Sequence, residues 1–385
     1  MKNKTIPIFL TFLVMGVADA MGPMSDAVKN QYQLSNVMST LLPFFVFIAF
    51  AVFSVPGGLM ATRIGKKNLL LFGLGLNVVA MAIPTFVAPG FALLLGCIFL
   101  LGVGTTFLQV AGNPIMRDVS EEGDYSRNLA LAQGIKGVGS TTMTYLAIAG
   151  ISLAFLPALR SMGWRGAFPI FFVLMVLAFL LVVILKVKET KAEVPPSVVD
   201  SLTLLKKPVF ALAVLGIFLY VGAEVCMARF LKPTMTGFGF DDKQAGLFGP
   251  ALFFAALTLG RLVAGSVKVN AHTFFRLSAT LGLAGLVLIM TGAEYLAFAG
   301  VVMGGLGFAN IWPMLFAITV EEKPERASEL SGLMCMAISG GAIIPLVMGK
   351  LADIGMTSMA YIVPVICFVY LLLLSLKRGK KLAKA

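Results

Sequence analysis

Three ionisable side chains, Asp19, Lys136 and Glu224, lie inside long apolar segments of the sequence. Charged groups in such segments are costly to bury, and they usually face a polar cavity or another charge. A carboxylate held there can bind and release a cation, so we expect Asp19 to be a cation-coupling residue. The alternative is local, with Asp19 only capping backbone groups near Gly16 and Gly22.

Two pairs of polar side chains share helical faces within these segments. Gln109 and Asn113 are one helical turn apart, and Gln133 and Lys136 are three positions apart, which also places side chains on one face. Amides donate and accept hydrogen bonds without carrying charge, which suits ligands rich in hydroxyl groups. The alternative is hydrogen bonding between helices; we favour a polar cavity.

The second half of the chain carries its own polar candidates. Glu224 can accept hydrogen bonds from hydroxyl groups, or it can form an ion pair with Arg229 at the membrane edge. Asn310 and Trp312 are the counterparts in this half of the amide pair in the first half. We therefore expect ligand-binding groups in both halves.

The composition shows what kind of element must position these groups. Of 385 residues, 59% are hydrophobic and 12% are charged, against about 25% charged in soluble domains. Apolar stretches of about 20 residues recur, the length that crosses a ~30 Å hydrocarbon core as a helix. This excludes a soluble enzyme, a nucleic-acid binder and a secreted disulfide scaffold.

Cofactor and enzyme chemistry is not expected. The four cysteines lie in apolar segments without metal-ligand spacing, which indicates buried reduced thiols and no metal site. No span contains an H-E-x-x-H or G-x-S-x-G motif, so an intramembrane enzyme is the weakest alternative.

The chain is predicted to be an all-α integral membrane protein with twelve transmembrane helices in two six-helix halves. The predicted halves are residues 1–187 and 208–385, the second ending in a basic cytoplasmic tail, and a polar cytoplasmic linker spans residues 188–207. The predicted spans are 5–24, 36–61, 68–88, 91–116, 128–155 and 167–187, then 208–229, 244–264, 274–292, 295–320, 330–352 and 359–376.

The distribution of basic residues predicts the orientation. Most of the 30 Lys and Arg residues, Arg261 among them, are assigned to segments that are cytoplasmic if the N-terminus is inside. Both termini are then cytoplasmic in a bacterial-type inner (plasma) membrane. The net charge of +12 is expected to contact anionic lipid headgroups and not nucleic acid.

The two halves repeat a pattern. Residues 102–139 and 305–341 each contain a small-residue helix with a proline near its end, then an acidic pair and a basic residue, then a glycine-rich helix. Tandem halves of this kind place a substrate at the membrane midplane between them and work by alternating access. The alternative is that such features are common to membrane bundles in general.

Four segments carry a resemblance to a known family: Asp19 to Pro23, Gln109 to Pro114, Tyr220 to Glu224, and Met336 to Gly349. Through them the chain resembles the major facilitator superfamily, and within it the fucose–galactose–glucose:proton symporter family. The superfamily loop motif at residues 58–67 is weaker, because Thr62 stands where an aspartate is usual.

The resemblance implies uptake of a monosaccharide, a neutral hexose, by cation-coupled symport. Asp19 is the expected coupling residue, and the protein is expected to act as a monomer among membrane lipids. The residues expected to bind the sugar are Gln109, Asn113, Gln133, Lys136, Tyr220, Glu224, Asn310 and Trp312.

Departures from the family leave alternatives open. Gln109 stands where the symporters have a glutamate, and Lys136 stands where the family has an asparagine. Asp19 then carries a proton, or holds sodium with oxygen neighbours, or Lys136 is a fixed surrogate cation in a uniporter. A sugar acid held by Lys136 and Arg229 is the alternative substrate, and a transport-dead membrane sensor is the alternative class.

Overall fold

A computed structural model describes residues 4–39, 41–148, 162–190, 197–268, 270–353 and 359–382. Helices account for most of these residues and no strand occurs among them, so the all-α prediction is confirmed. Ten helical segments of the described chain are long and apolar enough to cross a membrane. The predicted spans 5–24 and 128–155 correspond to a shorter apolar helix of 15 residues and a helix of 24 residues. The second of these predictions extends into residues 149–161, which lie outside the described part.

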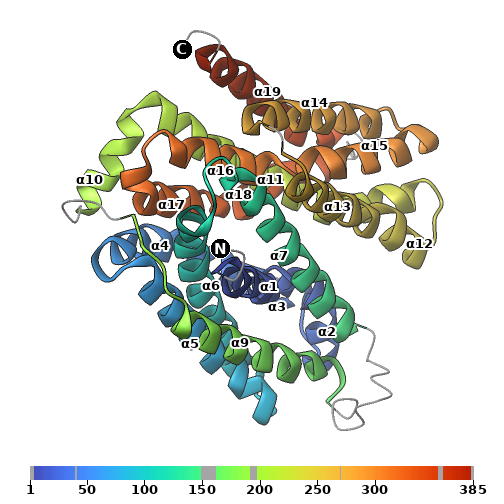
Figure 1. The fold of residues 1–385 in the computed structure, drawn as a ribbon. Helices are drawn as coiled ribbons and strands as arrows, with labels where there is room; N and C mark the ends of the chain where they lie inside the picture. The colour runs from blue at the N-terminus through green and yellow to red at the C-terminus, as the bar shows by residue number, and fades with distance from the viewer. Residues whose placement is uncertain are drawn as a thin grey trace. The chain divides into compact units, whose positions relative to one another are not determined.

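Contacts divide the chain into two compact units, which are described separately here. Unit 1 comprises residues Met1–Glu122, Ile135–Ser201 and Pro324–Met336. Its elements can be followed by label in Figure 1. They are α1 (Thr5–Asp19), α2 (Met21–Tyr32), α3 (Asn36–Ser39), α4 (Leu41–Ile64), α5 (Lys66–Phe86), α6 (Phe91–Val119), most of α7 (Tyr125–Ile148), η2 (Gly163–Gly166), α9 (Ala167–Ile184), the start of α10 (Val198–Thr203), η5 (Pro324–Arg326) and α17 (Ala327–Met336).

Unit 2 comprises residues Gly123–Gly134, Leu202–Lys323 and Ala337–Ala385. Its α14 and α15 lie side by side (Figure 1). Besides the start of α7 and the end of α10, its elements are η3 (Leu204–Lys206), α11 (Pro208–Gly237), α12 (Asp242–Gly246), η4 (Leu247–Ala251), α13 (Leu252–Ser266), α14 (Ala271–Met290), α15 (Glu294–Phe308), α16 (Ile311–Glu321), η6 (Ala337–Ser339), α18 (Gly340–Asp353), η7 (Met359–Tyr361) and α19 (Ile362–Leu382). The predicted division into halves joined by residues 188–207 remains a prediction.

Glycines bring the backbones of α1 and α7 into direct contact in unit 1. A Cβ atom on Gly139 would lie 2.0 Å from the carbonyl oxygen of Leu13, and one on Gly16 would lie 2.4 Å from the carbonyl oxygen of Lys136. Small residues permit such close approach between membrane helices. Because α1 ends at Asp19, this contact brings the last turn of α1 close to Lys136.

The predicted span 295–320 is two helices in unit 2. The first, α15, ends at Phe308, and α16 begins at Ile311. Pro313 has no backbone N–H, so the carbonyl of Ala309, four residues earlier, has no helical donor. The proline therefore accounts for a break in the helix at Ala309 and Asn310.

Candidate functional site

Three of the predicted residues of unit 1 form a polar cluster, which we call the unit 1 cluster: Asp19, Gln109 and Lys136. The Lys136 Nζ atom lies 2.9 Å from Asp19 Oδ2 and donates a hydrogen bond to Gln109 Oε1 at 3.1 Å. The three side chains come from α1, α6 and α7. Lys136 is buried, whereas the Asp19 side chain is 42% exposed. The cluster is therefore accessible at its carboxylate.

The charge balance of this cluster limits what it can bind. The Lys136 ammonium is neutralised by Asp19, and the Gln109 amide adds polarity without charge. An ion pair beside an amide offers hydrogen-bond donors and acceptors to hydroxyl groups while carrying no net charge. A proton delivered to Asp19 would remove the ion pair and leave Lys136 with the amide oxygen.

Two further predicted residues, one on α6 and one on α7, are buried. Asn113, one turn beyond Gln109 on α6, is fully buried, and its Nδ2 lies 3.9 Å from the Cys335 Sγ atom of α17. Gln133, on α7, is also buried, at 3% exposure.

The four cysteines predicted to be reduced thiols are free and buried. No group of metal-binding side chains occurs in the part of the chain that the structure describes.

The second cluster, the unit 2 cluster, is centred on Arg261 of α13. Its Nε donates to the Ala309 carbonyl oxygen at 3.0 Å, and its Nη2 donates to Tyr220 Oη at 3.2 Å. The same Nη2 lies 3.6 Å from Glu224 Oε1, and Tyr220 and Glu224 are one turn apart on α11. Arg261, which was not among the predicted site residues, thus contacts two that were, Tyr220 and Glu224.

The assignment of Arg261 to a cytoplasmic segment stays a prediction, but the structure places its side chain inside unit 2 and not on the surface. Arg261 is 8% exposed and lies within an apolar helix, Lys243–Ser266, that is long enough to span a membrane. The ion pair found for Glu224 is with Arg261, a partner other than the Arg229 considered from the sequence. The available signal was the uncharged run on both sides of Arg261 within its own predicted span.

Asn310 and Trp312 lie at the helix break and are buried, with 4% and 3% exposure. Asn310 Nδ2 donates to the Gly260 carbonyl oxygen at 3.3 Å. Asn310 Oδ1 and Trp312 Nε1 have no hydrogen-bond partner among the described residues. Leaving a buried polar group unsatisfied costs about 1–3 kcal/mol, so these atoms are suited to a hydroxyl group supplied by a ligand.

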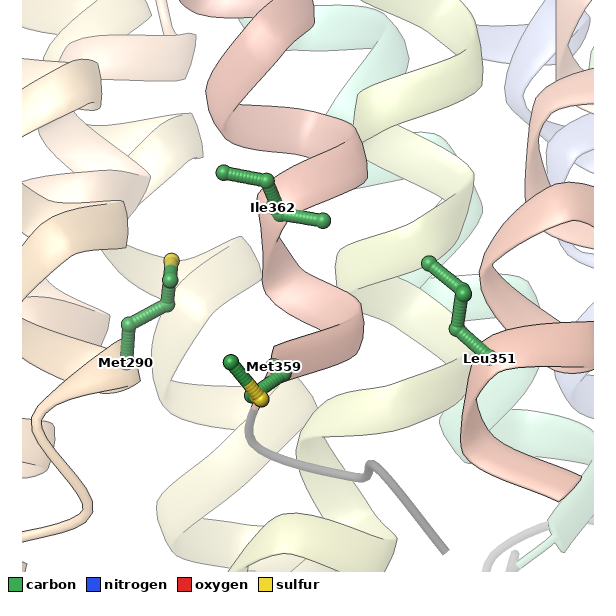
Figure 2. Close-up of a pocket in the computed structure, with 4 residues that line it drawn as sticks. All are labelled: Met290, Leu351, Met359 and Ile362. Atoms are coloured by element: carbon green, nitrogen blue, oxygen red, sulfur yellow. The ribbon is translucent and has the colours of Figure 1, made fainter. Parts of the chain in front are cut away.

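A cavity elsewhere in unit 2 does not suit the same chemistry. It has a volume of about 170 Å³ and is lined by Met290, Leu351, Met359 and Ile362, which Figure 2 shows around the start of α19. All four side chains are apolar, so none can orient a hydroxyl group. Each polar cluster, and not this cavity, is therefore a candidate site within its own unit.

The loop motif that departs from the superfamily pattern has its own ion pair in unit 1. Lys66, at the start of α5, pairs with Asp118 of α6, and both side chains are buried. Thr190 Oγ1 donates to the same carboxylate at 2.9 Å, and Glu189 accepts the backbone N–H of Lys66. Thr62 instead donates to a carbonyl of its own helix.

Comparisons with known proteins settle the family. The model of the Major Facilitator Superfamily matches residues 8–267. The chain belongs to the Major Facilitator Superfamily. A "Glucose/galactose transporter" of Brucella abortus (strain 2308) is 30% identical over 363 residues, covering 89% of this chain and 86% of the relative. An "L-fucose-proton symporter" of Haemophilus influenzae is 20% identical and covers 98% of both chains.

A solved structure shares the whole fold. The superfamily transporter FucP in its outward conformation matches with a TM-score of 0.84 at 18% identity, covering 97% of this chain and 98% of that one. The resemblance drawn from four segments of the sequence is thereby confirmed. The chain is a multi-pass membrane protein of a transporter superfamily, as its relatives are transporters.

Proposed function

We propose that this protein takes up a neutral hexose by cation-coupled symport through alternating access. The names of the glucose/galactose and fucose–proton relatives support sugar as the substrate and symport as the mode. The bacterial relatives support a plasma-membrane location, and the basic residues support cytoplasmic termini. We further propose a monomer that needs no cofactor and catalyses no covalent reaction.

The observation that carries the neutral substrate is the 2.9 Å contact between Lys136 and Asp19. A sugar acid would need an uncompensated cation, whereas Lys136 already has a carboxylate partner. Arg261 likewise lies beside Glu224 in unit 2. Two charge-balanced clusters with amide and phenol groups match a polyhydroxylated, uncharged ligand better than an anion.

For coupling, we propose that Asp19 binds the transported proton. Protonation would abolish its ion pair with Lys136 and free the ammonium to donate to a sugar hydroxyl, which links the two binding events. Sodium is less well supported, because hard cations prefer oxygen ligands and an ammonium group lies 2.9 Å from the carboxylate. A uniporter in which Lys136 replaces the coupling cation is the second candidate, favoured by the non-titrating Gln109 beside Lys136.

The proposed sugar ligands extend beyond the two charged pairs. Asn310 and Trp312 supply an acceptor and a donor that have no partner among the described residues. Their burial supports a role in binding, because an unsatisfied buried group gains most from a ligand hydroxyl. The complete proposed set is Gln109, Asn113, Gln133, Lys136, Tyr220, Glu224, Asn310 and Trp312.

The test is thermal unfolding of the purified protein with glucose, galactose, glucuronate and galacturonate, each with and without sodium. A ligand at about 100 times its Kd stabilises by roughly 2.7 kcal/mol, which is a measurable shift in Tm. We expect a shift with a hexose and none with either sugar acid, independent of sodium. A shift with the acids alone would overturn the neutral substrate, and binding without flux in proteoliposomes would indicate a sensor.

A further inference from the structure

The helix break between α15 and α16 leaves one backbone carbonyl without its usual donor. In a continuous helix, the N–H four residues ahead would donate to the Ala309 oxygen, but that residue is Pro313. Arg261 Nε donates to this oxygen at 3.0 Å instead. The guanidinium of one helix thus supplies the hydrogen bond that the proline of another removes.

A second hydrogen bond runs in the opposite direction between the same segments. Asn310 Nδ2 donates to the Gly260 carbonyl, next to Arg261 in the sequence. The close approach requires a glycine, because a Cβ on Gly260 would lie 2.7 Å from Ala309 Cβ. Arg261 and Asn310 therefore fix the break against α13 through reciprocal bonds.

The hydrogen bond to Gly260 occupies only the nitrogen of the Asn310 side-chain amide. Its Nδ2 is bonded to Gly260, which fixes the direction of Oδ1, and Oδ1 has no partner among the described residues. Trp312 Nε1, two residues on, is also without one. A sugar hydroxyl can donate to an amide oxygen and accept from an indole N–H, so these two atoms match the chemistry of the proposed substrate.

Only an arginine can hold these partners together. Its Nε donates to the Ala309 carbonyl, while its Nη2 donates to Tyr220 and lies near Glu224. The planar guanidinium therefore contacts the helix break and α11 at the same time. A lysine has the same charge but a single terminal nitrogen, and it cannot reproduce the fork.

We propose that Arg261 is a positioning residue for sugar recognition, which holds the break in the conformation that presents Asn310 Oδ1 and Trp312 Nε1 to the substrate and so sets the preference between hexose epimers. This rests on the proposed function of hexose transport. Arg261 acts through the break, whereas Asn310 and Trp312 contact the sugar.

The test compares Arg261→Lys with Arg276→Lys, which changes an exposed arginine on α14. Sugar affinity is measured by isothermal titration with glucose and with galactose, alongside the Tm of the sugar-free protein. For Arg261→Lys we expect about a tenfold loss of affinity for the preferred epimer, the equivalent of one or two hydrogen bonds. The glucose-to-galactose ratio should move toward one, while Arg276→Lys keeps both values.

A double-mutant cycle separates positioning from general stability. Trp312→Phe removes the Nε1 donor, so it should weaken binding in the wild-type background. In the Arg261→Lys background it should add little, because the indole is no longer presented. Additive losses would show that Arg261 and Trp312 act independently and would overturn the proposal.

Pro313→Ala provides a variant that restores the missing backbone donor. With an N–H available, the helix can close across the break, and we expect the same loss of affinity and epimer preference with no loss of Tm. Unchanged affinity and epimer ratio in both Pro313→Ala and Arg261→Lys would overturn the positioning role and leave hexose transport standing. Absence of any hexose binding by the wild-type protein would overturn both.

Discussion

The ion pairs of the unit 1 cluster and the unit 2 cluster differ in how their cation is shared. In unit 1, Lys136 lies 2.9 Å from Asp19 and has one further partner, the Gln109 amide. In unit 2, Arg261 lies 3.6 Å from Glu224 and also bonds a backbone carbonyl and a phenol. The Lys136 ammonium therefore interacts mainly with a carboxylate, whereas the Arg261 guanidinium interacts mainly with a backbone carbonyl and a phenol hydroxyl.

This difference predicts different roles for the two pairs. Asp19 is 42% exposed, and in the proposed coupling the proton would act directly on its pair with Lys136. The Glu224 side chain is 20% exposed, and its cation would keep its bonds to Ala309 and Tyr220 if Glu224 were neutral. We therefore expect the unit 1 pair to control coupling and the unit 2 pair to control recognition.

The largest effect should come from separating the unit 1 pair without removing either charge. Gly139→Ala places a Cβ 2.0 Å from the Leu13 carbonyl, so α1 must move away from α7. Overpacking of this kind costs about 1–3 kcal/mol or more, and gradient-driven uptake should fall more than sugar affinity. Uptake by proteoliposomes and Tm are the measurements. Gly75→Ala is the control, since its added Cβ meets nothing within 4 Å.

The matched change in unit 2 should give the opposite pattern. Gly260→Ala places a Cβ 2.7 Å from Ala309 Cβ, which pushes α13 away from the helix break. We expect about a tenfold loss of hexose affinity, the equivalent of about 1.4 kcal/mol, with the proton-to-sugar ratio unchanged. Titration calorimetry and pH-electrode flux measure the two quantities. A change in the proton-to-sugar ratio in Gly260→Ala, or equal losses of uptake and sugar affinity in Gly139→Ala, would contradict the distinction between the pairs.

A smaller effect is expected from removing the lysine itself. Lys136→Ala deletes one charge-assisted partner of Asp19, and neutral hexose affinity should fall only several-fold, or about 1 kcal/mol. Glucuronate should remain a non-ligand, because Lys136 is paired in the wild-type protein. Binding of glucuronate by the wild type that disappears in this variant would show instead that Lys136 is an anion ligand.

How far the sequence predicts this site depends on the residue. Asp19 and Lys136 stand out because charges are rare in apolar segments, and helical periodicity predicts the membrane helices. Their 2.9 Å contact requires the α1–α7 approach, which depends on which face of each helix Gly16 and Gly139 occupy. Sequence spacing within one helix carries no such information about its neighbour.

Arg261 was missed for a different physical reason. Basic residues near the end of a span are usually cytoplasmic, and Arg261 lies close to the end of its predicted span, 244–264. The buried Arg261 donates to the Ala309 carbonyl that Pro313 leaves without a donor, 48 positions along the chain. The proline is visible in the sequence, but the residue that compensates for it is not.

The smallest effect concerns a titrating group outside both clusters. Hydrogen bonds from Ser197 lower the pKa of Asp200 below its usual range. A lowered pKa stabilises the folded protein at pH values above the ordinary pKa of aspartate. This stabilisation is lost as the pH falls through the pKa of Asp200 in the folded state. Because Asp200 is exposed, Ser197→Ala should lower Tm only slightly at pH values above the ordinary aspartate pKa, with the difference disappearing at lower pH, and should leave pH-dependent uptake unchanged. A changed uptake profile would mean that coupling is not confined to the unit 1 cluster.

Asp19→Asn tests the central claim most directly. The variant is reconstituted in proteoliposomes and assayed for hexose accumulation driven by a proton gradient and for exchange of labelled hexose at equilibrium. Asp241→Asn, an exposed helix cap where asparagine also caps well, is the control. We expect Asp19→Asn to abolish accumulation and keep exchange, while the control keeps both. Accumulation at the wild-type level in Asp19→Asn would contradict it.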